Sequence, residues 1–358
     1  MSRAGLCSRR AVLGALSAIA AAPLVGAGAA RAATGELIWS VWESNGDPSY
    51  VKAFEAAQGA AIRQAYMTGN DAQFAALRTG AAFDAVTPSL SEMTQYVRSG
   101  LIQPLDTGRI PGMARLYDVF AAMDVTRDAG GATYGVPYLW GANPITYRRD
   151  KFDAEPGYAT LFDSRYKGQL SMRDYPLEAV AIAGIFVGVP RDQLFSMDAA
   201  QLAEARKALL AQKPLLRSYW QSIGDLTNQF ATGEITAAFS WRVPYDALKD
   251  KLPMAMARPA EGLFGWCDCI ALPADLDPAR VGITHAFIDY LLGPDYATPA
   301  AMDGNYATTT DVIRDALTPE HRADLFIDDL TYMKSFIWPS KPDNYAEWIK
   351  IWAEVKAS

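Results

Sequence analysis

Hydrophobic and polar positions follow two different periods in the region from residue 36 to residue 98. Short apolar runs predict β-strands, and apolar residues spaced three or four positions apart predict helices between them. The predicted elements are strand 36–42, helix 48–58, strand 61–66, helix 72–78, strand 83–88 and helix 91–98. This alternating order predicts an α/β fold with a parallel sheet and helices on both of its faces.

The ends of these predicted strands are the first place to expect a ligand. In open α/β sheets, ligands bind outside the carboxyl ends of the strands. The segments 42–45 (WESN) and 88–91 (PSLS) lie at the carboxyl ends of two predicted strands of the sheet. We therefore expect both segments to face a binding site.

The middle of the chain changes character and then returns to alternating elements. Segment 134–147 (YGVPYLWGANPITY) is rich in glycine, proline and aromatic residues, which suits a linker between two lobes. The elements predicted after it are strand 169–173, helix 177–187, helix 199–212, strand 215–220, helix 225–231, strand 236–241, strand 264–272, a helix within 278–292 and helix 345–355. The sequence therefore predicts a second α/β lobe.

The N-terminus has the pattern of an export signal. Arg3, Arg9 and Arg10 precede an apolar run at 11–29, and Ala30-Arg31-Ala32 follows as a small-x-small cleavage site. We therefore predict a signal peptide over residues 1–32 and a periplasmic protein. The run 8–13 (SRRAVL) resembles a twin-arginine signal, and an ordinary Sec signal is the alternative.

Charge and composition limit the chemistry of the chain. The formal net charge is −7 and no basic run is present, so a nucleic-acid partner is not expected. Cys267 and Cys269 would face the same side of a strand, and burial is the simplest expectation for both. Neither His285 nor His321 stands near them in the sequence, so we expect no metal site.

We expect no cofactor and no enzymatic activity. The sequence after residue 32 contains no GxSxG, HExxH, Walker or CxxC motif. An exported enzyme of an unfamiliar kind remains the alternative, because the twin-arginine route often carries cofactor proteins.

Several fragments, taken in order, resemble the polyamine-binding branch of periplasmic solute-binding proteins. These fragments are a strand ending in Trp42, Pro88-Ser89 before a helix, 136–141 (VPYLWG) leading to Tyr147, Gly233-Glu234-Ile235 before a strand ending in Trp241, Trp266-x-Asp268 followed by 270–273 (IALP), and Asn305-Tyr306-Ala307. The resemblance implies two α/β lobes joined by crossing strands, with the ligand in the cleft between them. Lobe one would be residues 34–138 plus 266–312, and lobe two 139–265 plus 313–358. The implied partners are a small amine and the permease of an ABC importer, and we expect a monomer.

The resemblance also implies a set of ligand-binding residues. In this family, aromatic rings surround the methylene chain of the amine, and carboxylates bind its ammonium ends. The matching positions are Trp42, Glu178, Trp241, Trp266 and Asp268, with Ser89, Tyr306 and Tyr138 as weaker candidates. A carboxylate supplies the charge and acceptors that a desolvated ammonium needs, and indole faces attract cations.

Each candidate also has a plain structural interpretation. The three tryptophans could serve core packing, because tryptophan is largely buried on average. Asp268 could cap backbone groups or pair with an arginine. Glu178 could be a solvated residue in the first turn of a helix, where the helix dipole favours a carboxylate.

Some positions depart from the polyamine-binding pattern and suggest a second class of ligand. Glu43 stands near a position where the family often has tyrosine, and Arg242 follows Trp241 where smaller or neutral residues are common. Either Arg242 or Arg217 would suit a ligand carboxylate if it faced the cleft. The alternative ligand is therefore a zwitterionic amino acid such as γ-aminobutyrate.

Overall fold

The computed structural model describes residues 35–43 and 45–358. The predicted signal peptide at 1–32 lies outside the described residues. Residues Glu36–Ser358 form one compact unit. Of the helices that the structure describes, none is long and apolar enough to cross a membrane.

A parallel three-stranded sheet forms the centre of lobe one, in the order β2-β1-β3. Its strands are β1 (Glu36–Val41), β2 (Ala61–Tyr66) and β3 (Ala85–Val86), and both pairings are parallel as predicted. The helices that alternate with these strands are α1 (Lys52–Gln58), α2 (Asn70–Arg78) and α3 (Met93–Arg98). The central strand β1 is buried almost throughout, which explains its nearly continuous apolar sequence.

The predicted helix 48–58 begins as a different kind of helix. Residues Pro48–Val51 form a 3₁₀-helix, in which the Asp47 carboxylate accepts a hydrogen bond from the Ser49 backbone N–H and Pro48 occupies the first turn. The α-helix follows, and it ends at Gly59 with a φ of 62°, a left-handed conformation that glycine adopts without strain. The helical segment therefore begins at Pro48, as the sequence predicts.

A five-stranded mixed sheet forms the centre of lobe two, in the order β10-β6-β9-β7-β8. Its strands are β6 (Ile145–Arg148), β7 (Leu170–Arg173), β8 (Leu216–Trp220), β9 (Ala237–Phe239) and β10 (Met254–Met256). Strand β7 runs parallel to both neighbours, whereas β6 is antiparallel to β9 and β10. The helices of this lobe are α5 (Pro176–Phe186), α6 (Ala199–Gln212), α7 (Ile223–Thr232), α8 (Val243–Leu248) and α13 (Tyr345–Ala357).

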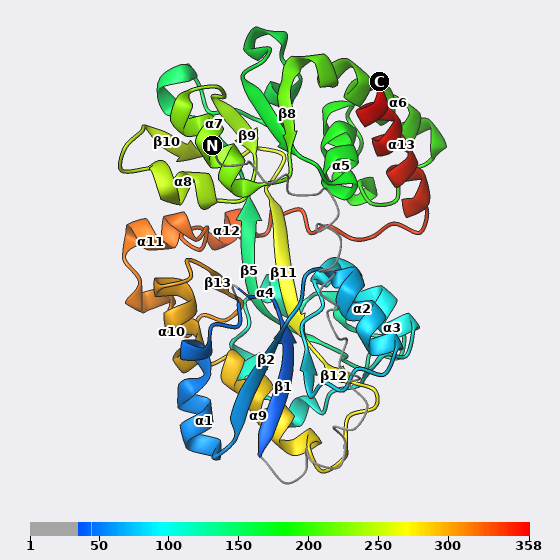
Figure 1. Cartoon of the computed structure of the whole chain (residues 1–358), viewed down its shortest axis with the longest axis vertical. Coiled ribbons are helices and arrows are strands. Elements are labelled where there is room, and N and C mark those ends of the chain that lie inside the picture. Colours follow the sequence, from blue (N-terminus) through cyan, green and yellow to red (C-terminus); the bar gives the residue numbers. More distant parts are fainter. Residues whose placement is uncertain (1–34, 44) are drawn as a thin grey trace, which may run out of the picture. The chain divides into compact units, whose positions relative to one another are not determined.

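Two long antiparallel strands run between the two groups of elements (Figure 1). They are β5 (Val136–Asn143) and β11 (Phe264–Ile270), and we call the pair the crossing ribbon. The segment 134–147, predicted as a linker, is therefore ordered mainly as β5 and β6. Tyr138 and Trp140 of β5 are buried, because β5 lies between β11 and β13 (Ala307–Thr308).

The other elements lie around lobe one and between the lobes. The short strands β4 (Ile102–Gln103) and β12 (Leu272–Pro273) form an antiparallel pair. The remaining helices are α4 (Asp118–Ala121), α9 (Val281–Leu291), α10 (Pro294–Met302), α11 (Pro319–Asp324) and α12 (Leu330–Met333).

The apolar cores correspond to the two sheets and to the region around the crossing ribbon. One core surrounds Trp39 of β1, and another lies around the buried helix α5 of lobe two. A third contains Trp140 of β5 and Met93 of α3 together with Phe326 and Phe336. Residues between 313 and 336 thus pack against the ribbon and lobe one, although the lobe boundaries themselves stay a prediction.

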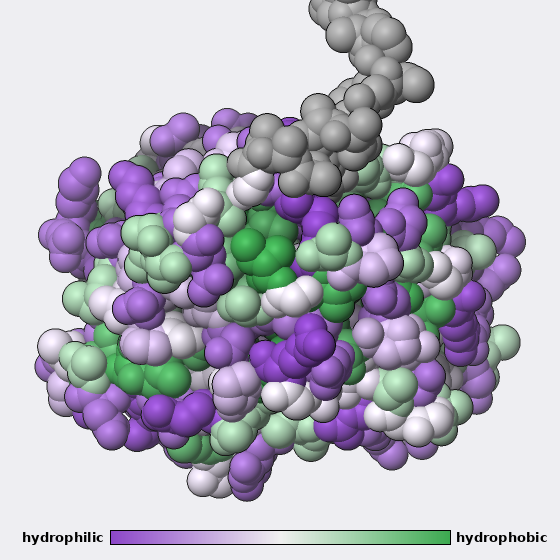
Figure 2. Space-filling view, turned by 90° about the horizontal axis from the view of Figure 1, so that it is seen from below, coloured by the Kyte–Doolittle hydropathy of each residue, from purple (hydrophilic) through white to green (hydrophobic). Residues whose placement is uncertain are grey.

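The surface at the lower end of Figure 1 is mixed in character. Figure 2 shows hydrophobic residues there as small separate patches among hydrophilic ones. Such scattered exposure is normal for a folded domain and indicates no particular interface.

Candidate functional site

A buried carboxylate lies where the crossing ribbon meets the sheet of lobe one. Asp268 of β11 is only 3% exposed. Its Oδ2 accepts a hydrogen bond of 2.7 Å from Asn45 Nδ2, and its Oδ1 accepts one of 2.9 Å from Ser89 Oγ. Both donors are neutral, and among the described residues Asp268 has no cationic partner. We call Trp42, Asn45, Ser89 and Asp268 the Asp268 cluster.

The sheet of lobe one explains why these residues meet. Trp42 and Asn45 follow β1, and Ser89 follows β3, so all three lie at the carboxyl ends of neighbouring parallel strands. Ser89 also forms an isolated antiparallel bridge with Asp268. The expectation that segments 42–45 and 88–91 lie near a common site is consistent with this arrangement.

Neighbouring groups fix the two hydrogen-bond donors. Tyr296 Oη donates to the Asn45 carbonyl at 3.0 Å, and the Asn45 N–H donates to the Trp42 carbonyl at 3.1 Å. Asn70 Nδ2 donates to Ser89 Oγ at 3.2 Å, which leaves the Ser89 hydroxyl proton for Asp268. The donors are therefore held in place before any ligand arrives.

Burial dominates the ionisation of Asp268. Loss of solvation raises its pKa to about 7, although hydrogen bonds from the side chains of Ser89, Asn45 and Trp42 act in the opposite direction. A carboxylate of this kind is costly to keep charged until a cation arrives.

One face of the crossing ribbon extends from Asp268 towards lobe two. Successive side chains of a strand point to opposite faces, so Asp268, Trp266 and Phe264 share one face of β11. Their partners in the register are Leu139, Gly141 and Asn143 of β5. This face therefore places a carboxylate, an indole and an amide in a row.

Trp266 lies directly on the backbone of Gly141. A Cβ atom added to Gly141 would lie 2.7 Å from Trp266 Cζ2, so only glycine leaves room for the indole. The Tyr306 ring meets the Trp266 ring edge-on, with 5.7 Å between centroids. Trp266 and Tyr306, both predicted site residues, thus form one aromatic pair, and both are partly exposed.

A second group of candidate site residues lies at the carboxyl ends of the strands of lobe two. Arg173 ends β7, Glu178 lies in the first turn of α5, and Trp241 follows β9. Arg173 Nη1 lies 3.3 Å from Glu178 Oε2, and the Arg173 guanidinium lies over the rings of Trp241 and Tyr175, 4.5 and 4.8 Å from their centroids. We call Arg173, Tyr175, Glu178 and Trp241 the Arg173 cluster.

Glu178 is buried and connects this cluster to the crossing ribbon. Asn143 Nδ2 donates to Glu178 Oε1 at 2.7 Å. Burial raises the pKa of Glu178, while the charge and hydrogen bonds of Arg173 and the hydrogen bond of Asn143 oppose that shift. Glu178 is therefore not a solvated helix residue, and the guanidinium of Arg173 already balances its charge.

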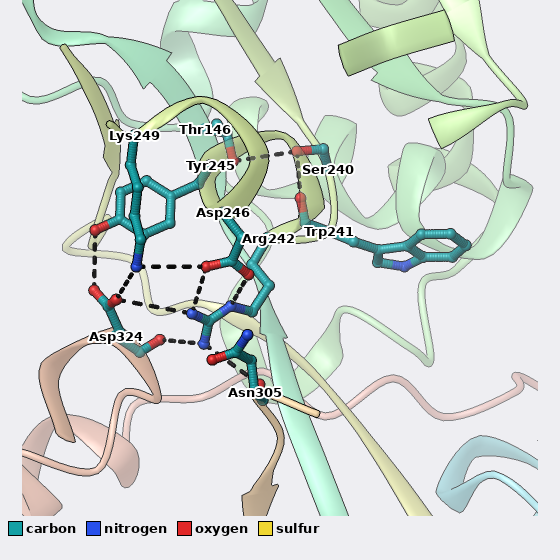
Figure 3. A network of polar contacts seen from close by, with 9 residues as sticks. All are labelled: Thr146, Ser240, Trp241, Arg242, Tyr245, Asp246, Lys249, Asn305 and Asp324. Atoms are coloured by element: carbon teal, nitrogen blue, oxygen red, sulfur yellow. Dashed lines mark hydrogen bonds and ion pairs between the residues drawn. The ribbon is translucent and has the colours of Figure 1, made fainter. Parts of the chain in front are cut away.

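Arg242 follows Trp241 but lies in a different environment (Figure 3). Its Nε and Nη2 donate to Asp246 at 2.7 and 2.8 Å, and its Nη1 donates to the Asp324 carbonyl at 2.8 Å. The Trp241 side chain points away from this network in Figure 3. The guanidinium of Arg242 thus connects α8 to the end of α11.

Arg217, the other arginine considered for a ligand carboxylate, forms a surface ion pair. Its Nη2 lies 2.9 Å from Glu234 Oε2, and about half of each side chain is exposed. The structure therefore offers Arg173, and neither Arg217 nor Arg242, as the arginine beside predicted site residues.

Four residues of this candidate site were not among the sequence candidates: Asn45, Asn143, Arg173 and Tyr175. Asn45 lies in a segment that was expected to face the site, so its position after β1 was the available signal. Nothing in the sequence marks Arg173 or Asn143, because both contact Glu178 only in the folded protein. Arg173 reaches Glu178 across the turn between β7 and α5, and Asn143 reaches it from β5.

Two cavities lie away from these clusters, with volumes of about 320 and 380 Å³. The first is lined by residues that include Tyr245, Arg258 and Asp324, and the second by residues that include Tyr117 and Arg314. Neither cavity is lined by a residue of the Asp268 cluster or of the Arg173 cluster.

The predicted behaviour of the two cysteines is confirmed. Cys267 and Cys269 are free and buried, and their side chains interact with each other. They lie on the face of the ribbon opposite to Asp268.

Comparison with known proteins places the chain in a family. The model of the family described as bacterial extracellular solute-binding protein matches residues 49–325. The spermidine/putrescine-binding periplasmic protein of Escherichia coli (strain K12) is 25% identical over 286 residues, covering 78% of this chain and 79% of that protein.

Solved structures share the fold. The spermidine/putrescine ABC transporter substrate-binding protein PotD of Streptococcus pneumoniae superposes with a TM-score of 0.78 at 20% identity, covering 90% of this chain and 98% of that chain. A GABA receptor superposes with a TM-score of 0.69 at 17% identity, covering 90% and 97%. The predicted two-lobed α/β fold is confirmed by these neighbours and by the sheets described above. The family match spans most of the chain, and the chain therefore belongs to the bacterial extracellular solute-binding proteins.

Proposed function

We propose that this chain is the periplasmic solute-binding subunit of an ABC importer and that it captures a small cationic amine. Its family is one of solute-binding proteins, and curated relatives are named for binding spermidine and putrescine. In this proposal the amine lies between the lobes, with one ammonium group at Asp268, and the protein then delivers it to the membrane permease.

The buried carboxylate of Asp268 is the observation that carries the proposal. Neutral donors on Asn45, Ser89 and Trp42 hold it, and no cation among the described residues balances its charge. An uncompensated buried charge is costly, and burial raises the pKa of Asp268 to about 7. A ligand ammonium would supply both the missing charge and a strong hydrogen bond.

The aromatic residues supply a surface for the methylene chain. Trp266 lies two residues from Asp268 on the same face of the ribbon, and Trp42 adjoins Asp268 from lobe one. Covering methylene groups contributes about 0.8 kcal/mol per buried CH₂. An indole face beside the ammonium contributes roughly 0.5–2 kcal/mol more.

The position of the site suits capture by closure of the two lobes. The ribbon face joins the Asp268 cluster in lobe one to the Arg173 cluster in lobe two through Asn143. A ligand that contacts both clusters favours the closed arrangement, because it binds that arrangement better than the open one.

A second candidate ligand is a zwitterionic amino acid such as γ-aminobutyrate. The observation that favours it is the Arg173 guanidinium, which lies beside Glu178 and Trp241 in lobe two. Arg173 is therefore the candidate partner for a ligand carboxylate, a role that the sequence suggested for Arg217 or Arg242.

Calorimetric titration of the purified, refolded protein tests the proposal. Putrescine, spermidine and γ-aminobutyrate are titrated in parallel, and we expect at least one to bind with micromolar affinity or better. Asp268→Asn should weaken that binding at least 100-fold, whereas Asp275→Asn, a change at an exposed carboxylate, should leave it unchanged. Absence of binding for all three ligands, or full binding by Asp268→Asn, would refute the proposal.

A further inference from the structure

We propose that Arg173 is a specificity-determining residue that restricts the site to amines with a single cationic end. This inference rests on the proposed function and narrows the class of amine. In this proposal the Arg173 guanidinium occupies the position that a second ammonium of the ligand would need. The far end of the ligand is therefore a hydrogen-bonding group without positive charge.

The surroundings of Arg173 are those that would hold an ammonium. The Arg173 guanidinium lies 3.3 Å from the Glu178 carboxylate and over the faces of two aromatic rings, Trp241 and Tyr175. A carboxylate together with ring faces is the combination that binds cationic groups. Here the guanidinium of Arg173, a group of the protein itself, lies between that carboxylate and those rings.

The Arg173 cluster adjoins the same face of the ribbon as Asp268. Asn143, which donates to Glu178, pairs with Phe264, and Asp268 lies four residues further along β11. Four residues of an antiparallel strand span about 14 Å. Trp266 lies between the two ends, so an extended small molecule along Trp266 would reach from Asp268 towards Asn143.

Asn143 offers an acceptor for the far end of the ligand. The residue is buried, and its Oδ1 has no hydrogen-bond partner among the described residues. A buried polar atom without a partner costs free energy, which a donor on the ligand would recover. A hydroxyl or amide group at the far end would donate to Asn143 without adding charge.

The balance of charge distinguishes the two ends. Within the part of the chain that the structure describes, Asp268 has no cationic partner, whereas Arg173 neutralises Glu178. A second acidic residue near Tyr175, Glu92, is also paired, because Lys341 Nζ lies 3.2 Å from its Oε2. The site thus has one unbalanced negative charge, and a second ammonium would be repelled by Arg173.

A matched pair of ligands tests this assignment. Putrescine and 4-amino-1-butanol have the same carbon chain, but only putrescine has a second ammonium. We expect the wild-type protein to bind 4-amino-1-butanol at least tenfold more tightly than putrescine in calorimetric titrations. In Arg173→Gln, which frees the Glu178 carboxylate, that preference should shift at least tenfold towards putrescine.

Three further variants separate charge from damage to the fold. Arg173→Lys keeps the cation and should keep the wild-type preference. The double variant Arg173→Gln with Glu178→Gln removes both charges, and its preference should move back towards that of the wild type. This result can be measured even if Arg173→Gln alone folds poorly. Arg217→Gln removes an arginine from an exposed ion pair and should change nothing. Circular dichroism verifies that each variant is folded.

The outcomes distinguish this inference from the proposed function. If Asp268→Asn abolishes amine binding but the preference is the same in wild type, Arg173→Gln and the double variant, the role of Arg173 is refuted and amine capture stands. If the wild-type protein binds neither amine, the inference about Arg173 is refuted, and amine capture is refuted with it only when spermidine and γ-aminobutyrate also fail to bind.

Discussion

The buried carboxylate of Asp268 costs the ligand-free protein stability when it is charged, and in our proposal a bound ammonium offsets that cost. Its carboxylate is held by neutral donors in a place where water is excluded, and burial raises its pKa to about 7. The folded protein therefore holds a proton between pH 4 and pH 7 that the unfolded chain releases. The unfolding free energy of the ligand-free protein consequently falls as pH rises through this window.

Replacing Asp268 should stabilise the empty protein at alkaline pH. The raised pKa costs up to about 4 kcal/mol of unfolding free energy above pH 7, and Asp268→Asn removes that cost. We expect denaturant unfolding at pH 8 to show a more stable variant, with the advantage shrinking at pH 5. An advantage that does not vary with pH would show that Asp268 does not titrate in this range.

Ligand affinity should depend on pH through the same group. An ammonium needs the ionised carboxylate, so affinity should fall about tenfold for each pH unit below the pKa of Asp268, near 7, and be nearly constant between pH 7.5 and 9. Titrations at pH 5.5 and 8 measure this as a loss of roughly 30-fold. Equal affinities at both values would contradict a charged contact at Asp268.

Only some of these residues could be predicted from the sequence. Asp268 could be predicted as a candidate, because a charged residue inside an apolar strand requires a partner. Arg173 was not, because an arginine at the end of a strand is ordinary until the structure places it over Trp241. Glu178 was among the sequence candidates and stays a candidate, but its pairing with Arg173 could not be predicted because it depends on how β7 leads into α5.

At the scale of elements, the crossing ribbon organises the site. Its two faces carry different side chains, since Trp266 lies on one face and Cys267 on the other. Each face has a glycine covered by a tryptophan: Trp266 covers Gly141, and Trp338 covers Gly265. This symmetry provides a matched pair of substitutions.

Gly141→Ala should weaken ligand binding, whereas Gly265→Ala should act mainly on stability. The new methyl group at position 141 would approach Trp266 to about 2.7 Å and displace the indole from the ligand path, while that at 265 would collide with buried packing around Trp338. Titration should show at least tenfold weaker binding for Gly141→Ala, and thermal unfolding should show the larger loss, about 1–3 kcal/mol, for Gly265→Ala. Equal affinities in both variants would remove Trp266 from the site.

Element boundaries were predictable where local signals were strong. Strand 61–66 and helix 199–212 match β2 and α6 residue for residue, and α6 begins with a capping box between Asp198 and Gln201. Strand 83–88 shrinks to Ala85–Val86, because its partner strand pairs with only two of its residues. The short elements β10 and β13 depend on tertiary pairing and had no local signal.

At the scale of the molecule, two polar networks connect segments that are far apart in sequence. The Arg242 network joins α8 to Asp324, and Lys341 joins Glu92 of lobe one to the segment before α13. Sequence reasoning predicted the two lobes from alternating elements but had no access to these contacts. They depend on segments more than 70 residues apart.

Arg242→Ala should destabilise the protein and leave ligand affinity within about threefold. The substitution leaves the Asp246 carboxylate and the Asp324 carbonyl without their main donor, which costs about 1–3 kcal/mol. Thermal unfolding and titration of the same variant measure the two effects. A tenfold loss of affinity in a variant of unchanged stability would place Arg242 in the site after all.

A crystal structure of the protein with its tightest-binding amine is the most direct test of where the ammonium binds. We predict that the ammonium nitrogen lies about 2.7–2.9 Å from a carboxylate oxygen of Asp268, with the chain along Trp266. An ammonium bound to Glu178 with Arg173 displaced, or an amine bound elsewhere, would contradict the central role of Asp268.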